Sequence, residues 1–167
     1  ESRLNDLFAS LPGSTASHNR YMNLWNRTLK NPLGKSFAGL KKYWFDENKA
    51  AAADLMTRLQ IVPMLRLSEV YLVAMETCTS LDELLSLYKT YMTDREYTLY
   101  TPFKSLDEAK AELVNEIRRE LIGEGQVFYA YKRLGLKSIL WNKKEMTADD
   151  YVLPLPSSEY NPNQTKK

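Results

Sequence analysis

The sequence predicts an all-α protein made of helical hairpins and irregular loops, with an extended C-terminal tail. Apolar residues recur at helical spacing through residues 64–134, which is the main sign of amphipathic helices. Only 6 glycines occur among 167 residues, and this disfavours a turn-rich β-sandwich or barrel. A hydrophobic content of 44% and a charged content of 26% are typical of a folded chain, here long enough for one domain.

The region that follows Pro63 is expected to hold four helices. They are residues 64–77, 81–92, 106–122 and 126–134. The sequence Ser-Leu-Asp-Glu begins the second helix at Ser80 and the third at Ser105, and it matches a capping box in which serine and glutamate bond the first turn. Gly123 suits the position just after the third helix. Short connections predict two antiparallel hairpins, the first helix with the second and the third with the fourth.

The segments on either side of these helices are expected to be less regular. Residues 1–12 have apolar side chains at helical spacing and predict a short helix, whereas residues 17–43 are loop-like and aromatic. Residues 46–59 carry an alanine run that fits either a helix or a loop. Pro154 and Pro156 predict an extended tail over residues 151–163.

Aromatic side chains among asparagines suggest a sugar-binding surface. Trp25, Tyr43 and Trp44, and then Trp141, are the candidate ligand-binding residues. Aromatic faces stack on pyranose rings while amides bond sugar hydroxyls. The alternative is that these rings only fix a long irregular segment to the core.

Composition excludes several other functions. The net charge of +2 does not favour nucleic acid. The single cysteine, Cys78, excludes an internal disulfide and a multi-cysteine zinc site, and we expect it to be a small buried residue. The single histidine, His18, leaves little for a metal or a nucleophile–base pair, so no metal or other cofactor is expected. Gly34-Lys35-Ser36 lacks the earlier glycine of a phosphate-binding loop, since that position is Leu29.

Residues 61–76, 117–133 and 151–163 resemble, in this order, three segments of the SusD/RagB family of Bacteroidetes outer-membrane lipoproteins. Residues 61–76, IVPMLRLSEVYLVAME, are similar to the family's iPmlRLsEvyLiaAE segment. Residues 117–133, IRRELIGEGQVFYAYKR, resemble its iRREligEGqrfyDlkR segment, although Ala130 stands where many members carry Asp. Residues 151–163, YVLPLPSSEYNPN, look like its closing Y.lPiP..Ei..Np segment. The resemblance covers residues 61–163, and residues 1–60 are less certain.

This resemblance implies a SusD-like fold of tetratricopeptide-related helical hairpins. Family members are much longer, so residues 1–167 would be the C-terminal portion of such a domain. They are non-catalytic proteins that bind glycans at the cell surface for polysaccharide utilisation. The implied partner is a SusC-like TonB-dependent transporter, and the implied location is the outer membrane's extracellular face, through a lipid anchor not present in this chain. Some relatives handle peptides, and a helical scaffold for protein partners without a sugar ligand is the alternative.

Charges within the first two of these segments are expected to form a structural network. Its predicted members are Arg66, Glu69, Arg118, Glu120 and Arg133. Arg66 and Glu69 are three residues apart and can pair on a helix surface. Partly buried charges need partners, because an unpaired one is costly. The catalytic alternative is a glycosidase carboxylate pair, Glu120 with Glu124.

Overall fold

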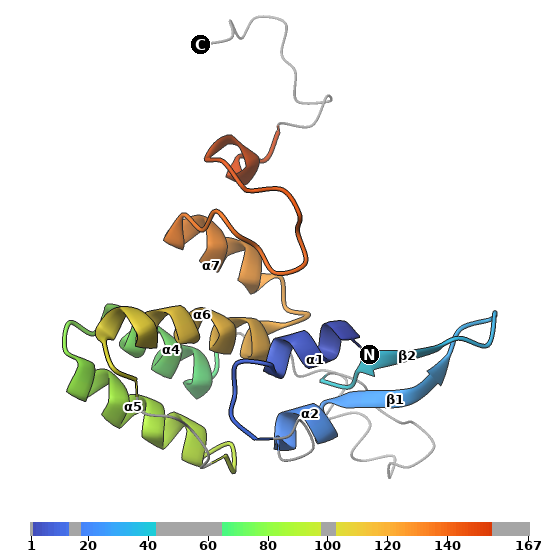
Figure 1. The fold of residues 1–167 in the computed structure, drawn as a ribbon, viewed down its shortest axis with the longest axis horizontal. Helices are drawn as coiled ribbons and strands as arrows, with labels where there is room; N and C mark the ends of the chain where they lie inside the picture. Colours follow the sequence, from blue (N-terminus) through green and yellow to red (C-terminus); the bar gives the residue numbers. More distant parts are fainter. Residues whose placement is uncertain (1, 14–17, 43–64, 98–102, 155–167) are drawn as a thin grey trace, which may run out of the picture. The chain divides into compact units, whose positions relative to one another are not determined.

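The computed structural model describes residues 2–13, 18–42, 65–97 and 103–154, which are mostly helical (Figure 1). In this part of the chain there are six α-helices and one two-stranded sheet. The chain forms two compact units, residues 1–124 and 125–167. No helix within the described ranges has the length and apolar character needed to cross a membrane. The predicted helical class is therefore confirmed, with the addition of a small sheet.

The N-terminal segment is helical and contributes to the core, as its apolar spacing predicts. Helix α1 runs over Ser2–Phe8 and packs on α6. Leu4, Leu7, Phe8 and Leu11 are all buried. A second short helix, α2, covers Asn19–Asn23 and buries Tyr21.

The expectation that residues 17–43 form a loop is wrong. After α2 the chain forms strand β1 (Trp25–Lys30) and strand β2 (Ser36–Leu40), which pair antiparallel (Figure 1). The turn between them is fixed by Asn31, whose Oδ1 accepts hydrogen bonds from the backbone N–H of Leu33 and Lys35. Gly34 has a φ of +74°, which glycine adopts without strain. The glycine considered for a phosphate-binding loop is thus a hairpin residue.

Three longer helices pack together and form most of the core of the first unit. They are α4 (Leu67–Thr77), α5 (Leu81–Thr93) and α6 (Leu106–Leu121). Their most buried apolar side chains are Leu72, Met75, Leu84, Tyr88, Tyr91, Met92, Leu113 and Ile117. The predicted pairing of the first two helices is confirmed, although α4 begins at Leu67 because Arg66 is extended. Cys78 is buried and unpaired, as expected.

The two predicted capping boxes behave differently. The Ser105 hydroxyl accepts a hydrogen bond of 3.2 Å from the Glu108 backbone N–H, which confirms the cap of α6. Ser80 makes no such side-chain bond at the start of α5, so the serine part of that prediction is wrong. The Glu108 carboxylate reaches back to the backbone N–H of Lys104, one residue before the cap.

Helix α4 has one buried and one exposed face. Met75 is fully buried, whereas Leu65, Leu67, Val70 and Val73 are exposed. Apolar side chains therefore cover a wide arc of this helix, and part of that arc faces away from the described core.

The second unit contains α7 (Gln126–Leu134), whose bounds match the prediction. Gly125 and Gly135 flank it with positive φ values of 75° and 59°. A short 3-10 helix, η2 (Asp149–Tyr151), follows, and the Tyr151 hydroxyl donates a 2.6 Å hydrogen bond to the Leu136 carbonyl. The prediction of an extended tail over residues 151–163 is therefore wrong at Tyr151, which ends this helix. Residues 155–163 of that tail lie outside the described residues, as do residues 46–59.

Candidate functional site

A buried arginine on α6 joins the first residues of the chain to the helical core. The Arg119 side chain is fully buried and its Nη1 donates hydrogen bonds to the Leu7 carbonyl at 2.8 Å and the Ser10 hydroxyl at 3.0 Å. Its Nη2 pairs with Glu112, and also with Glu116 at 2.7 Å. This uses the planar fork of donors that distinguishes arginine from lysine.

Glu116 is the centre of the network, because two arginines share it. It is fully buried and pairs with Arg20 of α2 at 2.9 Å as well as with Arg119. Burial alone raises the pKa of this carboxyl, but Arg119 and Arg20 lower it to about 2. Glu116 is therefore ionised at neutral pH, and its charge is balanced inside the protein.

One turn further along α6, Glu120 binds a second set of partners. Its carboxylate lies 3.3 Å from Arg95 Nε and 3.5 Å from Arg20 Nη1. The Tyr91 hydroxyl is 3.4 Å from both Glu116 and Glu120, and the Arg95 guanidinium lies 3.4 Å from the centre of the Tyr91 ring. Burial raises the pKa of Glu120, whereas Arg95 lowers it, and the net effect is a lowered pKa.

Glu124 and its two cationic partners fix the segment after α6. Glu124 pairs with Arg66 at 2.9 Å and also with Lys42. Arg66 in turn lies 3.4 Å from Glu69, at the predicted i,i+3 spacing. These contacts connect the start of α4, the end of the hairpin and the Gly123–Gly125 corner, where Gly123 has a φ of +80°.

The structure therefore includes three of the predicted network residues, Arg66, Glu69 and Glu120. Arg118 donates a hydrogen bond of 2.6 Å to Asn115 on the same helix. Arg133 lies on an exposed position of α7 in the second unit, and its part in the network stays a prediction. The sequence reasoning missed Arg20, Arg95, Glu112 and Glu116. Glu116 and Arg119 are the most deeply buried members of the network.

The arrangement gives no sign of the raised carboxyl pKa that a general acid needs. Glu120 has a lowered pKa. Glu124, its partner in the glycosidase alternative, is paired with two cations. Among the described residues, no group of three or more His, Cys, Asp or Glu could hold a metal ion. The network is best explained as a structural one.

His18 lies against this network and is buried between rings. It stacks on Phe8 at 5.7 Å and lies 4.5 Å from the Tyr97 ring, measured between ring centres. Its Nε2 has no hydrogen-bond partner in the described part of the chain. Burial first, and then Arg119 and Arg20, lower its pKa below the ordinary value of 6.5. The native protein therefore holds this imidazole neutral.

We expect the protein to lose stability as the pH falls below 6.5. The unfolded chain binds a proton at His18 near pH 6.5, whereas the native chain binds it only at a lower pH, so stability falls with pH below 6.5 by at most about 1.4 kcal/mol per pH unit for this one proton. Below pH 4.5 the lowered pKa of Glu116 adds a further loss. Urea unfolding between pH 8 and pH 5 measures the effect. His18→Phe should remove the slope between pH 6.5 and 5, and an unchanged slope in that variant would contradict the assignment.

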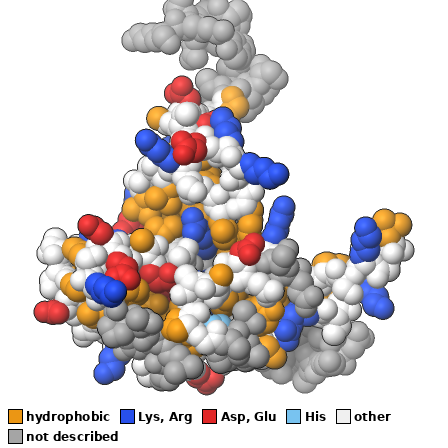
Figure 2. All heavy atoms as spheres, in the orientation of Figure 1, with side chains coloured by type: hydrophobic (Ala, Val, Ile, Leu, Met, Phe, Trp, Pro, Cys, Tyr) orange, Lys and Arg blue, Asp and Glu red, His pale blue; other side chains and the backbone are white. Residues whose placement is uncertain are grey.

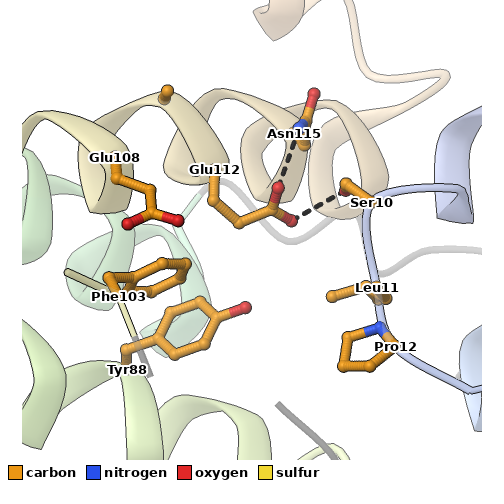
Figure 3. Close-up of a pocket in the computed structure, with 9 residues that line it drawn as sticks. Ser10, Leu11, Pro12, Tyr88, Phe103, Glu108, Glu112 and Asn115 are labelled. Carbon is orange, nitrogen blue, oxygen red and sulfur yellow. Dashed lines mark hydrogen bonds between the residues drawn. The ribbon is translucent and has the colours of Figure 1, made fainter. Parts of the chain in front are cut away.

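A cavity of about 310 Å³ opens beside the network, between α5, α6 and the chain that follows α1. Ser10, Leu11 and Pro12 line one side, and Tyr88, Phe103, Glu108, Ala111, Glu112 and Asn115 line the rest. Figure 3 shows the Tyr88 ring beside Phe103, with Glu108 above Phe103 and Glu112 facing Ser10. The two rings meet edge to face, with their centres 5.2 Å apart.

Several polar side chains at the wall of this cavity are held in place by hydrogen bonds. Glu112 accepts hydrogen bonds of 2.9 Å from both Ser10 and Asn115, which orients its carboxylate at the wall (Figure 3). Burial, and then Glu116 and Glu112, raise the pKa of the Tyr88 hydroxyl, which therefore stays protonated. The half-buried Phe103 ring beside carboxylate, amide and hydroxyl groups is suited to a polar ligand that also has an apolar face, such as a sugar, while the buried Tyr88 ring supports Phe103 from behind.

The predicted aromatic ligand-binding residues are not brought together in the described structure. Trp25 lies at the start of β1 and is partly exposed. Trp141 belongs to the second unit, is 43% exposed and has a positive φ of 69°. Tyr43 and Trp44 lie outside the described residues. The cavity residue Phe103, two residues before the Ser105 cap, was not predicted as a ligand contact, and neither was Tyr88 of α5.

Comparisons with protein-family models, with curated proteins and with solved structures found no match for this chain.

Proposed function

We propose that the protein is a non-catalytic glycan binder of the cell surface, working with a partner transporter of the outer membrane. The observation that carries this proposal is the cavity beside α6. It combines the half-buried Phe103 ring, which packs on the buried Tyr88 ring, with the hydrogen-bonding groups of Glu108, Glu112 and Asn115. We infer the ligand class, the SusC-like TonB-dependent partner and the SusD-like fold from the three sequence segments that resemble SusD/RagB proteins.

The charge network supports a binding role over a hydrolytic one. The carboxylates within the SusD-like segments, Glu120 and Glu124, are paired with arginine and lysine. A glycosidase would need one carboxyl held protonated near neutral pH. Release of reducing sugar by the purified protein, abolished in Glu120→Gln, is the result that would favour hydrolysis instead.

We expect the Phe103→Ala variant to bind a neutral polysaccharide about two- to tenfold more weakly than the wild type. Aromatic contacts of this kind contribute about 0.5–1.5 kcal/mol, and the substitution removes the half-buried ring of the cavity. Affinity electrophoresis on a panel of neutral polysaccharides identifies the ligand and measures the shift. Asn115→Ala should weaken binding as well, through the loss of an amide.

Tyr129→Ala is the matched control for this experiment. Tyr129 is an exposed aromatic of α7 in the second unit, so its loss should leave binding unchanged. If Phe103→Ala and Asn115→Ala both bind with wild-type affinity, the cavity is not the glycan-binding site. A wild-type protein that binds no polysaccharide of the panel would contradict glycan binding through this site.

The second candidate function is a scaffold for a protein or peptide partner. It is favoured by the exposed apolar side chains of Leu67, Val70 and Val73 on α4, together with Leu65 just before the helix. Contiguous exposed apolar surface often marks a protein contact. Co-purification with an outer-membrane transporter of the SusC type supports the first function. Peptide binding without glycan binding supports the second.

A further inference from the structure

The hairpin β1–β2 and the residues beside it are strongly cationic. Residues 24–42 contain five basic residues and no Asp or Glu, although the whole chain has a net charge of only +2. The five are Arg27, Lys30, Lys35, Lys41 and Lys42. Figure 2 shows Lys and Arg side chains on the visible face of this projecting hairpin. We call Arg27, Lys30, Lys35 and Lys41 the cationic strip.

These four cations are not neutralised by the described part of the protein. Lys42 pairs with Glu124, but Lys30, Lys35 and Lys41 are exposed, and none of them is in an ion pair with a described residue. The Arg27 side chain lies over the Tyr21 ring at 5.2 Å. Within the described chain its one hydrogen bond, of 3.4 Å, goes to the Met22 sulfur, a weak acceptor. Donors on Arg27 are therefore available for a ligand.

A small cavity of about 170 Å³ lies within the strip. Arg27, Ser36, Phe37 and Ala38 line it. Phe37 is 46% exposed, so its ring is accessible beside the guanidinium. Leu29 pairs with Phe37 across the strands. The Leu29 side chain occupies the space beside Gly39, where an added Cβ would collide with it. The cavity thus offers a cation, a hydroxyl and an aromatic face together.

We propose that this hairpin binds a polysaccharide that carries carboxylate groups, as a surface distinct from the cavity beside α6. The assignment of a sugar polymer rests on the proposed glycan-binding function. Arg27 pairs with the carboxylate of one sugar, Phe37 stacks on its ring, and Ser36 bonds a hydroxyl. Lys30 and Lys35 lie at the turn end of the hairpin and Lys41 follows β2 at its other end, so these cations are spread over the hairpin and can meet charges repeated along a linear chain.

This ligand class fits the hairpin better than the other anionic partners. A membrane surface calls for a large apolar face, but the exposed large apolar residues of the described hairpin are Leu33 and Phe37. Binding to single-stranded nucleic acid relies on several stacking rings, whereas the cavity offers one. A neutral polysaccharide would leave the cationic strip without partners.

The test uses the whole chain and a matched pair of ligands. Titration calorimetry compares oligogalacturonate with its fully methyl-esterified form, which has the same backbone without the charges. The wild type should bind the charged form, with affinity falling as salt rises. The triple variant R27Q/K30Q/K35Q should bind it about tenfold or more weakly, since each exposed charge contributes modestly. Phe37→Ala should weaken it as well.

The control is K89Q/K137Q/K143Q, which changes the net charge equally at three exposed lysines elsewhere. Retained binding in this control supports the hairpin site. Equal loss in both triple variants, equal binding of the esterified ligand, or equal affinity for an oligothymidylate would overturn the proposal. Binding of neutral polysaccharides without any binding of oligogalacturonate overturns it while leaving the proposed function intact. Hairpin-dependent binding of oligogalacturonate alone supports it and removes the cavity from the proposed function.

Discussion

Replacing Arg119 with alanine is expected to lower the free energy of unfolding by about 3–5 kcal/mol. The substitution leaves Glu116 and Glu112 without the cation that pairs with both, and it removes the donors bound by the Leu7 carbonyl and the Ser10 hydroxyl. A loss of this size is a large part of the total free energy of unfolding of an ordinary domain, which is about 5–15 kcal/mol. Urea unfolding followed by circular dichroism measures it.

The adjacent residue provides the control. Arg118 is only partly buried, so Arg118→Ala should cost no more than about 1 kcal/mol. Arg119→Lys keeps the charge but lacks the planar fork, and we expect it to remain clearly destabilised. Equal losses for Arg118→Ala and Arg119→Ala would show that the buried network does not determine stability.

The second large effect is expected on α4. Met75 is fully buried against the neighbouring helices, so Met75→Ala should cost about 2–5 kcal/mol through lost burial and the cavity left behind. Val73, two residues earlier, is 58% exposed, and Val73→Ala should stay within about 0.5 kcal/mol of the wild type. Urea midpoints of the two variants give the comparison directly.

This pair of variants also tests the exposed face of α4. If Val73→Ala destabilises the protein as much as Met75→Ala does, that face is packed in solution. A concentration-dependent midpoint in the wild type would then show that a second copy supplies the packing. An unchanged Val73→Ala variant leaves this face available to a separate partner.

The helices were predictable because their signals are local. The helices at Leu81–Thr93, Leu106–Leu121 and Gln126–Leu134 each have helical apolar spacing and an end signal of serine or glycine. The hairpin was missed because its turn lies among asparagines and exposed aromatics, which also suit a loop. The Asn31-Pro32-Leu33-Gly34 sequence was the available signal for a turn.

The central member of the charge network was also available from spacing. Glu116 follows Ala109 by seven residues and Leu113 by three, so a helix places all three on one face. By the same rule, Arg118 lies on a different side of the helix from Leu113. Applying the helical period to charged as well as apolar residues would have identified Glu116 as buried. The partners Arg20 and Arg95 come from distant segments, and no local rule identifies them.

The bond between Arg119 and the Leu7 carbonyl has a consequence for how the protein is made. The two residues are 112 positions apart in the chain. At a synthesis rate of about 5–20 residues per second, α1 waits roughly 5–20 s after it is made before its partner emerges from the ribosome. During that interval Leu4, Leu7 and Phe8 lack the α6 surface on which α1 packs. Helix α1 is therefore secured only after the chain as far as Arg119 has been made.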